Sequence, residues 1–291
     1  MQINKLPTNK FPSPLLEIPQ PPEDLWIIGE LPTDPDLIYL SVVGSRKFTS
    51  YGKEVCEKLI AGLKGYPIVI VSGFAMGIDT IAHKTALKVG LTTMVFPGSG
   101  LSKEAIFPKV NANLMEEIVS AGGCFISEFE PDFKATYWSF PMRNRLMSGI
   151  SKAVLVIEAE EKSGTLITAR LATEYNRDVL AVPGNIFSPN AKGTNKLIRQ
   201  GATPITSVED LLEALGFQKE ENEEEKENRQ KKLFEDLSND EKKVIALLRE
   251  PTPRDELTRA LKMPTQNANA LLSIMEIKGL IKEELGEIRI I

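Results

Sequence analysis

The sequence predicts a doubly wound α/β domain followed by a small second domain, and two observations carry this prediction. From residue 38 onward, short apolar runs of strand type alternate with stretches of helical period, and glycine-bearing turns lie between them. Such alternation is typical of a mostly parallel, Rossmann-like sheet with helices on both faces. After a highly charged segment, the pattern changes to three helices and a hairpin, which indicates a separate domain.

The elements of the first domain follow from this alternation. Candidate strands lie at residues 38–43, 68–71, 92–96, 124–127, 153–157 and 179–182. Helices are expected between them at 51–64, 79–89, 110–121, 143–150 and 165–176. A final unit, with helices at 194–200 and 207–215 around the run ATPIT, completes a domain that we place at residues 38–217.

Three further segments flank this domain. Residues 1–37 are rich in proline, which fixes φ and removes amide donors, so an extended lead-in is expected, with a short strand at 26–28. Residues 218–234 are dominated by charged side chains and predict a linker. Residues 235–291 predict helices at 238–249, after Pro253 and at 265–278, then a hairpin around Gly286, an order typical of a winged helix.

Composition narrows the class of protein. With 40 acidic against 35 basic residues, the chain does not coat nucleic acid by bulk charge, so any DNA site is a local patch. Cys56 and Cys124 lack metal-ligand or CxxC spacing, which suits a reducing cytoplasm without a disulfide or a metal site. The sequence contains no run of about 18 apolar residues, so it predicts neither a signal peptide nor a membrane span. We expect a cytoplasmic protein with no membrane contact and no cofactor.

The turns that follow the strands are the places where an open α/β sheet binds ligands. After the first strand, Gly44 and Ser45 allow a tight turn that brings Arg46 to the crevice. After the second strand, Gly73 begins a turn into a helix whose exposed amides would suit a phosphate. The alternative is that the glycines only permit a turn and that Asp79 only complements the helix dipole.

The stretch at 136–151 combines aromatic and basic side chains. Guanidinium groups bind phosphate in a bidentate manner and aromatic rings stack on bases, so this composition favours a single-stranded DNA site. The residues concerned are Tyr137, Trp138, Phe140, Arg143, Asn144 and Arg145. The alternative is that the rings are core residues and the arginines pair with acids, and for Trp138 we favour this alternative.

Two later turns repeat the arrangement. Ser163, Gly164 and Thr165 offer amides and hydroxyls at the start of a helix. Lys192 and Lys196 join the DNA site only if they face the same crevice; a plain turn is the commoner meaning of their surroundings.

Six motifs in this order resemble the DNA processing protein A (DprA/Smf) family: GSR at 44–46, SGFAMGID at 72–79, HKTAL at 83–87, FPMRNRLMSG at 140–149, SGTLITA at 163–169 and VPGN at 182–185. The resemblance implies a dimeric protein that binds single-stranded DNA and helps load the RecA recombinase in natural transformation. It implies DNA contacts by Arg46 and by the region from Phe140 to Arg145. Many members carry a SAM-like domain before the sheet, whereas here we expect only the proline-rich lead-in there. The chain also carries Tyr137 where some relatives have lysine.

Three other classes of protein are weighed against this interpretation. A phosphoribohydrolase-like enzyme would need a PGGxGTxxE motif, whereas the string at 97–104 lacks the threonine and places Glu104 out of register. The sole histidine, His83, lies within a helix and has no nucleophile beside it. A dinucleotide-dependent dehydrogenase would need GxGxxG after the first strand, which is absent. We therefore predict a protein that is not an enzyme.

A transcription regulator that reads duplex DNA is the third alternative. Residues 235–291 carry 11 acidic and 9 basic residues, and the helix at 265–278 offers only Lys278 as a base. We expect this module to contact protein instead. We assign dimerisation and recombinase contact to an apolar stripe of Leu211, Leu212 and Leu215. The alternative, that this stripe packs on the sheet of its own domain, is equally favoured by the sequence.

Overall fold

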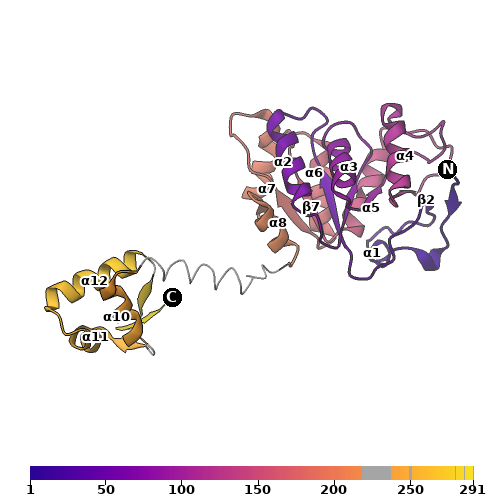
Figure 1. Ribbon diagram of the computed structural model, residues 1–291. Helices are drawn as coiled ribbons and strands as arrows, with labels where there is room; N and C mark the ends of the chain where they lie inside the picture. The colour runs from indigo at the N-terminus through magenta and orange to yellow at the C-terminus, as the bar shows by residue number, and fades with distance from the viewer. Residues whose placement is uncertain (218–236, 249–250, 279, 285, 291) are drawn as a thin grey trace. The chain divides into compact units, whose positions relative to one another are not determined.

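The computed structural model describes residues 1–217, 237–248, 251–278, 280–284 and 286–290. The chain divides into two compact units, residues 1–219 and residues 220–291, and Figure 1 shows both. The linker expected at 218–234 lies outside the described residues. None of the helices in the described parts of the chain is long and apolar enough to cross a membrane.

The first unit contains a nine-stranded sheet in the order β1-β2-β6-β5-β4-β3-β7-β8-β9. Neighbouring strands run parallel from β6 across to β9, whereas β1 and β2 pair antiparallel at the other edge. The chain builds outward from β3 in one direction and then from β7 in the other, so the strand order reverses between them. The strands are Asn4–Lys5, Trp26–Gly29, Ile38–Val43, Ile68–Ser72, Thr93–Val95, Cys124–Ser127, Ala153–Val156, Asp178–Ala181 and Thr203–Pro204.

Helices cover both faces of this sheet, as the alternating pattern predicts (Figure 1). Along β4, Ile68 and Ile70 pack into one apolar core, and Val69 and Val71 pack into the core on the opposite face. The helices are α1 Ser13–Leu16, α2 Ser50–Ala61, α3 Ile78–Val89, α4 Ala112–Ser120, α5 Ser139–Ile150, α6 Gly164–Glu174, α7 Lys192–Arg199 and α8 Val208–Ala214, with 3₁₀ turns at Thr8–Lys10, Lys109–Asn111 and Pro189–Ala191. The prediction of a doubly wound α/β fold is confirmed.

The expectation of an extended lead-in at residues 1–37 is wrong. The short strand is present, since β2 pairs with β6, but the segment before it also packs onto the domain. Leu15, Ile18 and Leu25 are almost fully buried in the core beside α5. Apolar residues spaced between the prolines give this segment enough surface to bury, and proline is compatible with extended packed backbone.

One helix begins earlier than the sequence pattern indicates. Helix α5 begins at Ser139, four residues before the expected start at 143, and contains Pro141 in its first turn. A proline there removes no intrahelical hydrogen bond, because the first amides of a helix have no partner within it. As a result, Phe140 and Arg143 lie on one rigid helix end.

The second unit has the predicted winged-helix order. Helices α10 Asn239–Leu247, α11 Arg254–Ala260 and α12 Thr265–Ile277 surround a core that includes Val244, Leu257 and Leu272. Strands β11 Ile281–Glu284 and β12 Glu287–Ile290 form the hairpin. A short strand β10, Thr252–Pro253, joins them in the order β10-β12-β11 and was not predicted.

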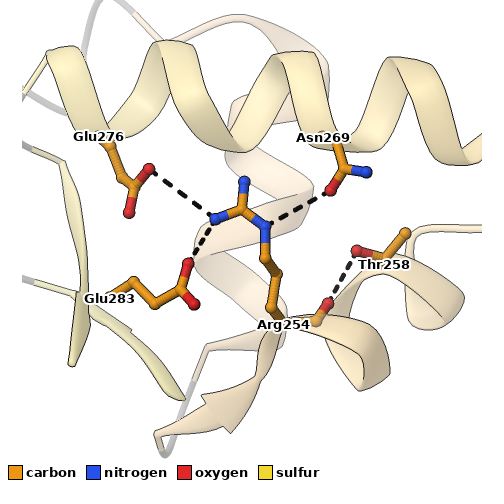
Figure 2. Close-up of polar contacts among 5 residues, drawn as sticks. All are labelled: Arg254, Thr258, Asn269, Glu276 and Glu283. Atoms are coloured by element: carbon orange, nitrogen blue, oxygen red, sulfur yellow. Dashed lines mark hydrogen bonds and ion pairs between the residues drawn. The ribbon is translucent and has the colours of Figure 1, made fainter. Parts of the chain in front are cut away.

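Arg254 connects three elements of this second unit (Figure 2). From the start of α11, its guanidinium bonds Glu283 of β11 and lies 3.9 Å from a carboxylate oxygen of Glu276 on α12. Its Nε donates to Asn269 Oδ1 at 3.4 Å. Arg254 is thus committed to interactions within its own unit.

Candidate nucleic-acid interface

The turns after β3, β4 and β7 meet the first turns of α5 at the carboxyl edge of the sheet. They line an open cleft of about 450 Å³, which we call the strand-end cleft. Its position at the reversal of strand order is where ligands bind in open α/β sheets. Ten of the fourteen predicted DNA-binding residues line it: Gly44, Ser45, Arg46, Tyr137, Phe140, Arg143, Asn144, Ser163, Gly164 and Thr165.

Arg46 is an exposed cation that lines this cleft. Its guanidinium carbon lies 5.3 Å from the centroid of the Phe140 ring, a cation–π geometry that orients the side chain. Within the described residues, Arg46 forms no ion pair with a carboxylate. Its donors therefore remain available for an anion.

Arg143 lies deeper, with only 5% of its surface exposed. Its Nη1 donates to the Phe96 carbonyl and its Nε donates to Asn144 Oδ1 at 3.1 Å, so the guanidinium is fixed in position. Burial lowers the pKa of Arg143 to about 10, which still leaves it charged at neutral pH. It forms a positive floor to the cleft.

Gly73 contributes space beneath the cleft. A Cβ at this position would overlap the Arg143 guanidinium and the Asp79 carboxyl group, which both lie against it. Gly73 does not line the strand-end cleft itself, so its predicted DNA contact stays a prediction. The absence of a side chain there lets Arg143 and Asp79 approach each other beneath the cleft.

Asp79 is the buried acid of the cleft, with 7% of its surface exposed. Burial raises its pKa to about 6, although the charges of Arg143 and Arg46 oppose this change. The ionised carboxylate reduces the positive potential at the floor of the cleft. Asp79 therefore does more than complement the dipole of α3.

The start of α6 forms another wall. The Ser163 side chain accepts a hydrogen bond from the Thr165 amide at 3.2 Å, and Thr165 Oγ1 donates to the Gly44 carbonyl at 3.2 Å. These bonds hold the N-terminus of an eleven-residue helix beside the turn that carries Arg46. The dipole of this helix favours an anion there.

Aromatic side chains lie at the mouth of the cleft. Tyr137 lines it and has 94% of its surface exposed. Trp138 packs against Phe133, with ring centroids 5.4 Å apart, and does not line the cleft, yet it is half exposed rather than a core residue. An exposed ring beside guanidinium groups provides a surface on which an unpaired base can stack.

The prediction that Arg145 binds DNA is wrong. Two residues along an α-helix correspond to a rotation of about 200°, so Arg145 points away from Arg143. It is 6% exposed, forms an ion pair with Glu128 and donates to the Gln20 carbonyl at 2.6 Å. Arg145 fastens the N-terminal segment to α5 instead.

Two other groups of predicted residues lie outside the cleft. Lys192 and Lys196 are exposed on α7 but do not line it. Leu211 and Leu215 are completely buried against the sheet, and Leu212 packs against the same core. The proposed docking stripe for a second copy or a recombinase is therefore part of the domain's own core.

The sequence reasoning missed Lys47 and Lys162, which both line the cleft, and Glu160, which opposes their charge. Lys47 and Lys162 each adjoin a motif that was recognised, so proximity to the motif was the available signal for the two lysines.

The residues of the enzyme alternatives are not in the cleft. His83 is fully buried and bonds Thr93 Oγ1 at 2.6 Å and the Gly73 carbonyl at 2.7 Å; burial lowers its pKa to about 4. Glu104 is exposed and also does not line the cleft.

Comparison with known proteins identifies the family of both units. The family model "DNA recombination-mediator protein A" matches residues 3–216, and the model "DprA winged helix domain" matches residues 230–287. DNA processing protein DprA of Bacillus subtilis is 39% identical over 215 residues, covering 73% of this chain and 71% of that protein. Protein Smf of Escherichia coli is 41% identical over 207 residues, which cover 71% of this chain but only 54% of that protein.

Solved structures show the same fold. DNA processing protein A of Streptococcus pneumoniae is 36% identical and superimposes with a TM-score of 0.66, covering 73% of this chain and 74% of that chain. The Helicobacter pylori protein, whose structure is reported with its single-stranded DNA binding mode, is 30% identical with a TM-score of 0.65 and coverages of 74% and 96%. The chain described here therefore belongs to the DNA recombination-mediator protein A family.

Proposed function

We propose that this protein binds single-stranded DNA in the strand-end cleft. The observation that carries the proposal is the convergence of Arg46, Arg143 and the start of α6 beside exposed aromatic rings. Arg46 and Arg143 would contact phosphates, while Tyr137 and the Phe140 ring would stack on bases. The Helicobacter pylori relative, whose structure is reported with a single-stranded DNA binding mode, supports single-stranded DNA as the ligand.

The chemistry of the cleft favours an unpaired strand over a duplex. A base can stack on a protein ring only when its face is free, and duplex bases are already stacked on one another. The chain is acidic overall, so binding depends on the local charge of the cleft rather than on the net charge.

In the cell, this binding would serve recombination. The protein would protect incoming single strands in the cytoplasm and help load RecA during natural transformation, as the family resemblance implies. A homodimer would hold one strand in two clefts and raise the effective affinity without new contacts. Membership of the recombination-mediator family supports this role, and the cleft supplies the DNA contact that it requires.

Fluorescence anisotropy with a labelled oligothymidylate and a duplex of equal length tests the proposal. We expect tighter binding of the single strand and a loss of about tenfold or more in Arg46→Ala, because one charge-assisted contact contributes roughly 1.5–3 kcal/mol. Lys196→Ala is the matched control, since it removes an exposed cation outside the cleft. Equal affinities of the wild-type and Arg46→Ala proteins would contradict the proposal.

A further inference from the structure

A second cavity lies beside the strand-end cleft at the same edge of the sheet. It has a volume of about 530 Å³ and lies between the start of α2 and the loop that follows β8. Its wall includes Thr49, Tyr51, Ile157, Val182 and Asn185. None of these residues takes part in the DNA contacts described above, so the cavity has no assigned role.

The wall of this cavity does not suit a phosphate. Glu158 is its single acidic or basic residue, and only 4% of that residue's surface is exposed. The Glu158 carboxyl accepts a hydrogen bond from the Thr49 amide at 2.9 Å and another from the Thr49 hydroxyl at 2.5 Å. An anionic ligand would meet a fixed acid with no cation beside it, so the cavity favours an uncharged, largely apolar group.

One exposed aromatic side chain lines this cavity, and three further exposed apolar side chains directly adjoin its lining residues in the sequence. Tyr51 is half exposed and donates its hydroxyl to the Pro183 carbonyl at 2.8 Å, which ties α2 to the loop after β8. In that loop, Ile186 and Phe187 have 75% and 86% of their surfaces exposed. Phe48, just before α2, is also exposed. Contiguous exposed apolar side chains can mark a binding site for a ligand or partner.

The cavity and the cleft share their dividing wall. Lys47 lines the cleft and Thr49 lines the cavity; similarly, Glu160 lines the cleft and Glu158 lines the cavity. The Asn190 side chain donates to the Lys47 carbonyl at 2.6 Å, and the Ala159 amide donates to the Asn190 carbonyl at 2.8 Å, so this wall is held in place. Residues two apart lie within about 7 Å of each other, a span that one extended nucleotide can bridge.

We infer that this cavity is a base-binding subsite for the same single strand whose phosphates occupy the strand-end cleft. A cationic groove beside an uncharged pocket with exposed rings matches the alternation of phosphate and base along a strand. The strand passes Lys47, and an unstacked base beyond it contacts Phe187 and Tyr51. The inference rests on the proposed function, and it extends the DNA path to a cavity lined by the VPGN motif at 182–185, to which no DNA contact was assigned.

Oligothymidylates of increasing length, tested with the full-length protein and with Phe187→Ala, measure this subsite. We expect the shortest oligonucleotide that binds the cleft to bind both proteins equally. Longer oligonucleotides bind the wild-type protein more tightly, and Phe187→Ala loses about tenfold of that affinity because stacking of one base is removed. Phe187→Trp retains a ring and keeps the affinity.

A fluorescent base analogue, 2-aminopurine, placed at successive positions of the longer oligonucleotide locates the contact. We expect its emission to fall at a position beyond the cleft with the wild-type and Phe187→Trp proteins, but not with Phe187→Ala. Ile277→Ala is the control, because Ile277 is also 86% exposed and lies in the winged-helix unit.

The outcomes separate the inference from the proposed function. If Arg46→Ala weakens binding but Phe187→Ala changes neither affinity nor emission, the subsite does not exist while the cleft stands, and the exposed patch serves a different partner. If the wild-type protein binds no single strand of any length, both the proposed function and the inference fail.

Discussion

Arg46 of the strand-end cleft and Arg254 of the winged-helix unit differ in whether carboxylates engage their guanidinium groups. Arg46 lies over an aromatic ring with its donors free, whereas Arg254 is bound by Glu276 and Glu283 (Figure 2). In addition, α12 carries no lysine or arginine between Thr265 and Ile277, and Lys278 after it bonds Glu241 at 2.7 Å. The position of carboxylates, rather than the number of basic residues, distinguishes the two surfaces.

Removing an acid from a buried pair in the first unit gives the largest expected effect on stability. Glu128→Ala leaves the Arg145 guanidinium, with 7% of its side chain exposed, without its partner. We expect a loss of about 3 kcal/mol in the free energy of unfolding, because an unpaired buried charge keeps its desolvation cost. Both tryptophans, Trp26 and Trp138, lie in this unit, so denaturant unfolding followed by tryptophan fluorescence reports the loss. A loss under about 1 kcal/mol would indicate that the pair is solvated.

An arginine replaced in each unit tests the difference in function. Arg143→Ala lowers single-stranded DNA affinity by about 10- to 100-fold, because a charge-assisted contact contributes roughly 1.5–3 kcal/mol. Arg254→Ala leaves that affinity unchanged, since its guanidinium is committed to carboxylates. Anisotropy titrations on natively folded proteins compare the two. A larger loss in Arg254→Ala than in Arg143→Ala would reverse the assignment.

The buried acid of the cleft, Asp79, should make the affinity for single-stranded DNA depend on pH, and we expect no such dependence from the winged-helix unit. Because burial raises the pKa of Asp79 to about 6, its carboxylate is ionised at pH 7.5 and offsets Arg143. Protonation as the pH falls through 6 removes this opposing charge, so affinity for single-stranded DNA rises by about three- to tenfold. Asp79→Asn binds more tightly at pH 7.5 and shows little change with pH. A wild-type affinity that falls between pH 7.5 and pH 5 would contradict this sign.

The smallest effect is expected in the winged-helix unit. Glu283→Ala removes one carboxylate from Arg254, but side chains of this pair are about one-third exposed. Pairs of this exposure contribute roughly 0–1 kcal/mol, and Glu276 remains nearby. Hydrogen exchange of the α11 and α12 amides in the full chain measures the change. A loss comparable to that of Glu128→Ala would show that Arg254 is as dependent on its partners as Arg145.

The sequence alone predicted most of the architecture, because strands, helices and turns are marked by patterns of neighbouring residues. Buried parallel strands such as Ile38–Val43 appear as apolar runs, and the turns after them carry the small residues that the cleft uses. The order of helices and hairpin in the second unit followed from helical period and from Gly286. Strands at 26–28 and 38–43 were placed correctly for the same reason.

The errors concern long-range packing, which local patterns do not contain. Arg143 and Arg145 share one motif, but only Arg143 lines the cleft. Arg145 is held away from it by Glu128 and Gln20, which lie elsewhere in the sequence. The stripe that includes Leu211 has the same pattern whether it faces a partner or its own sheet. The prolines before residue 37 concealed a packed segment, because proline frequency reports backbone preference rather than burial.

The most direct test of the cleft is the salt dependence of single-stranded DNA binding in the wild-type, Arg46→Ala and Arg254→Ala proteins. Each phosphate neutralised on a single strand contributes roughly −0.7 to the slope of log affinity against log salt concentration. We predict that the slope becomes shallower by about this amount in Arg46→Ala and stays at the wild-type value in Arg254→Ala. An unchanged slope in folded Arg46→Ala protein would show that the strand binds elsewhere.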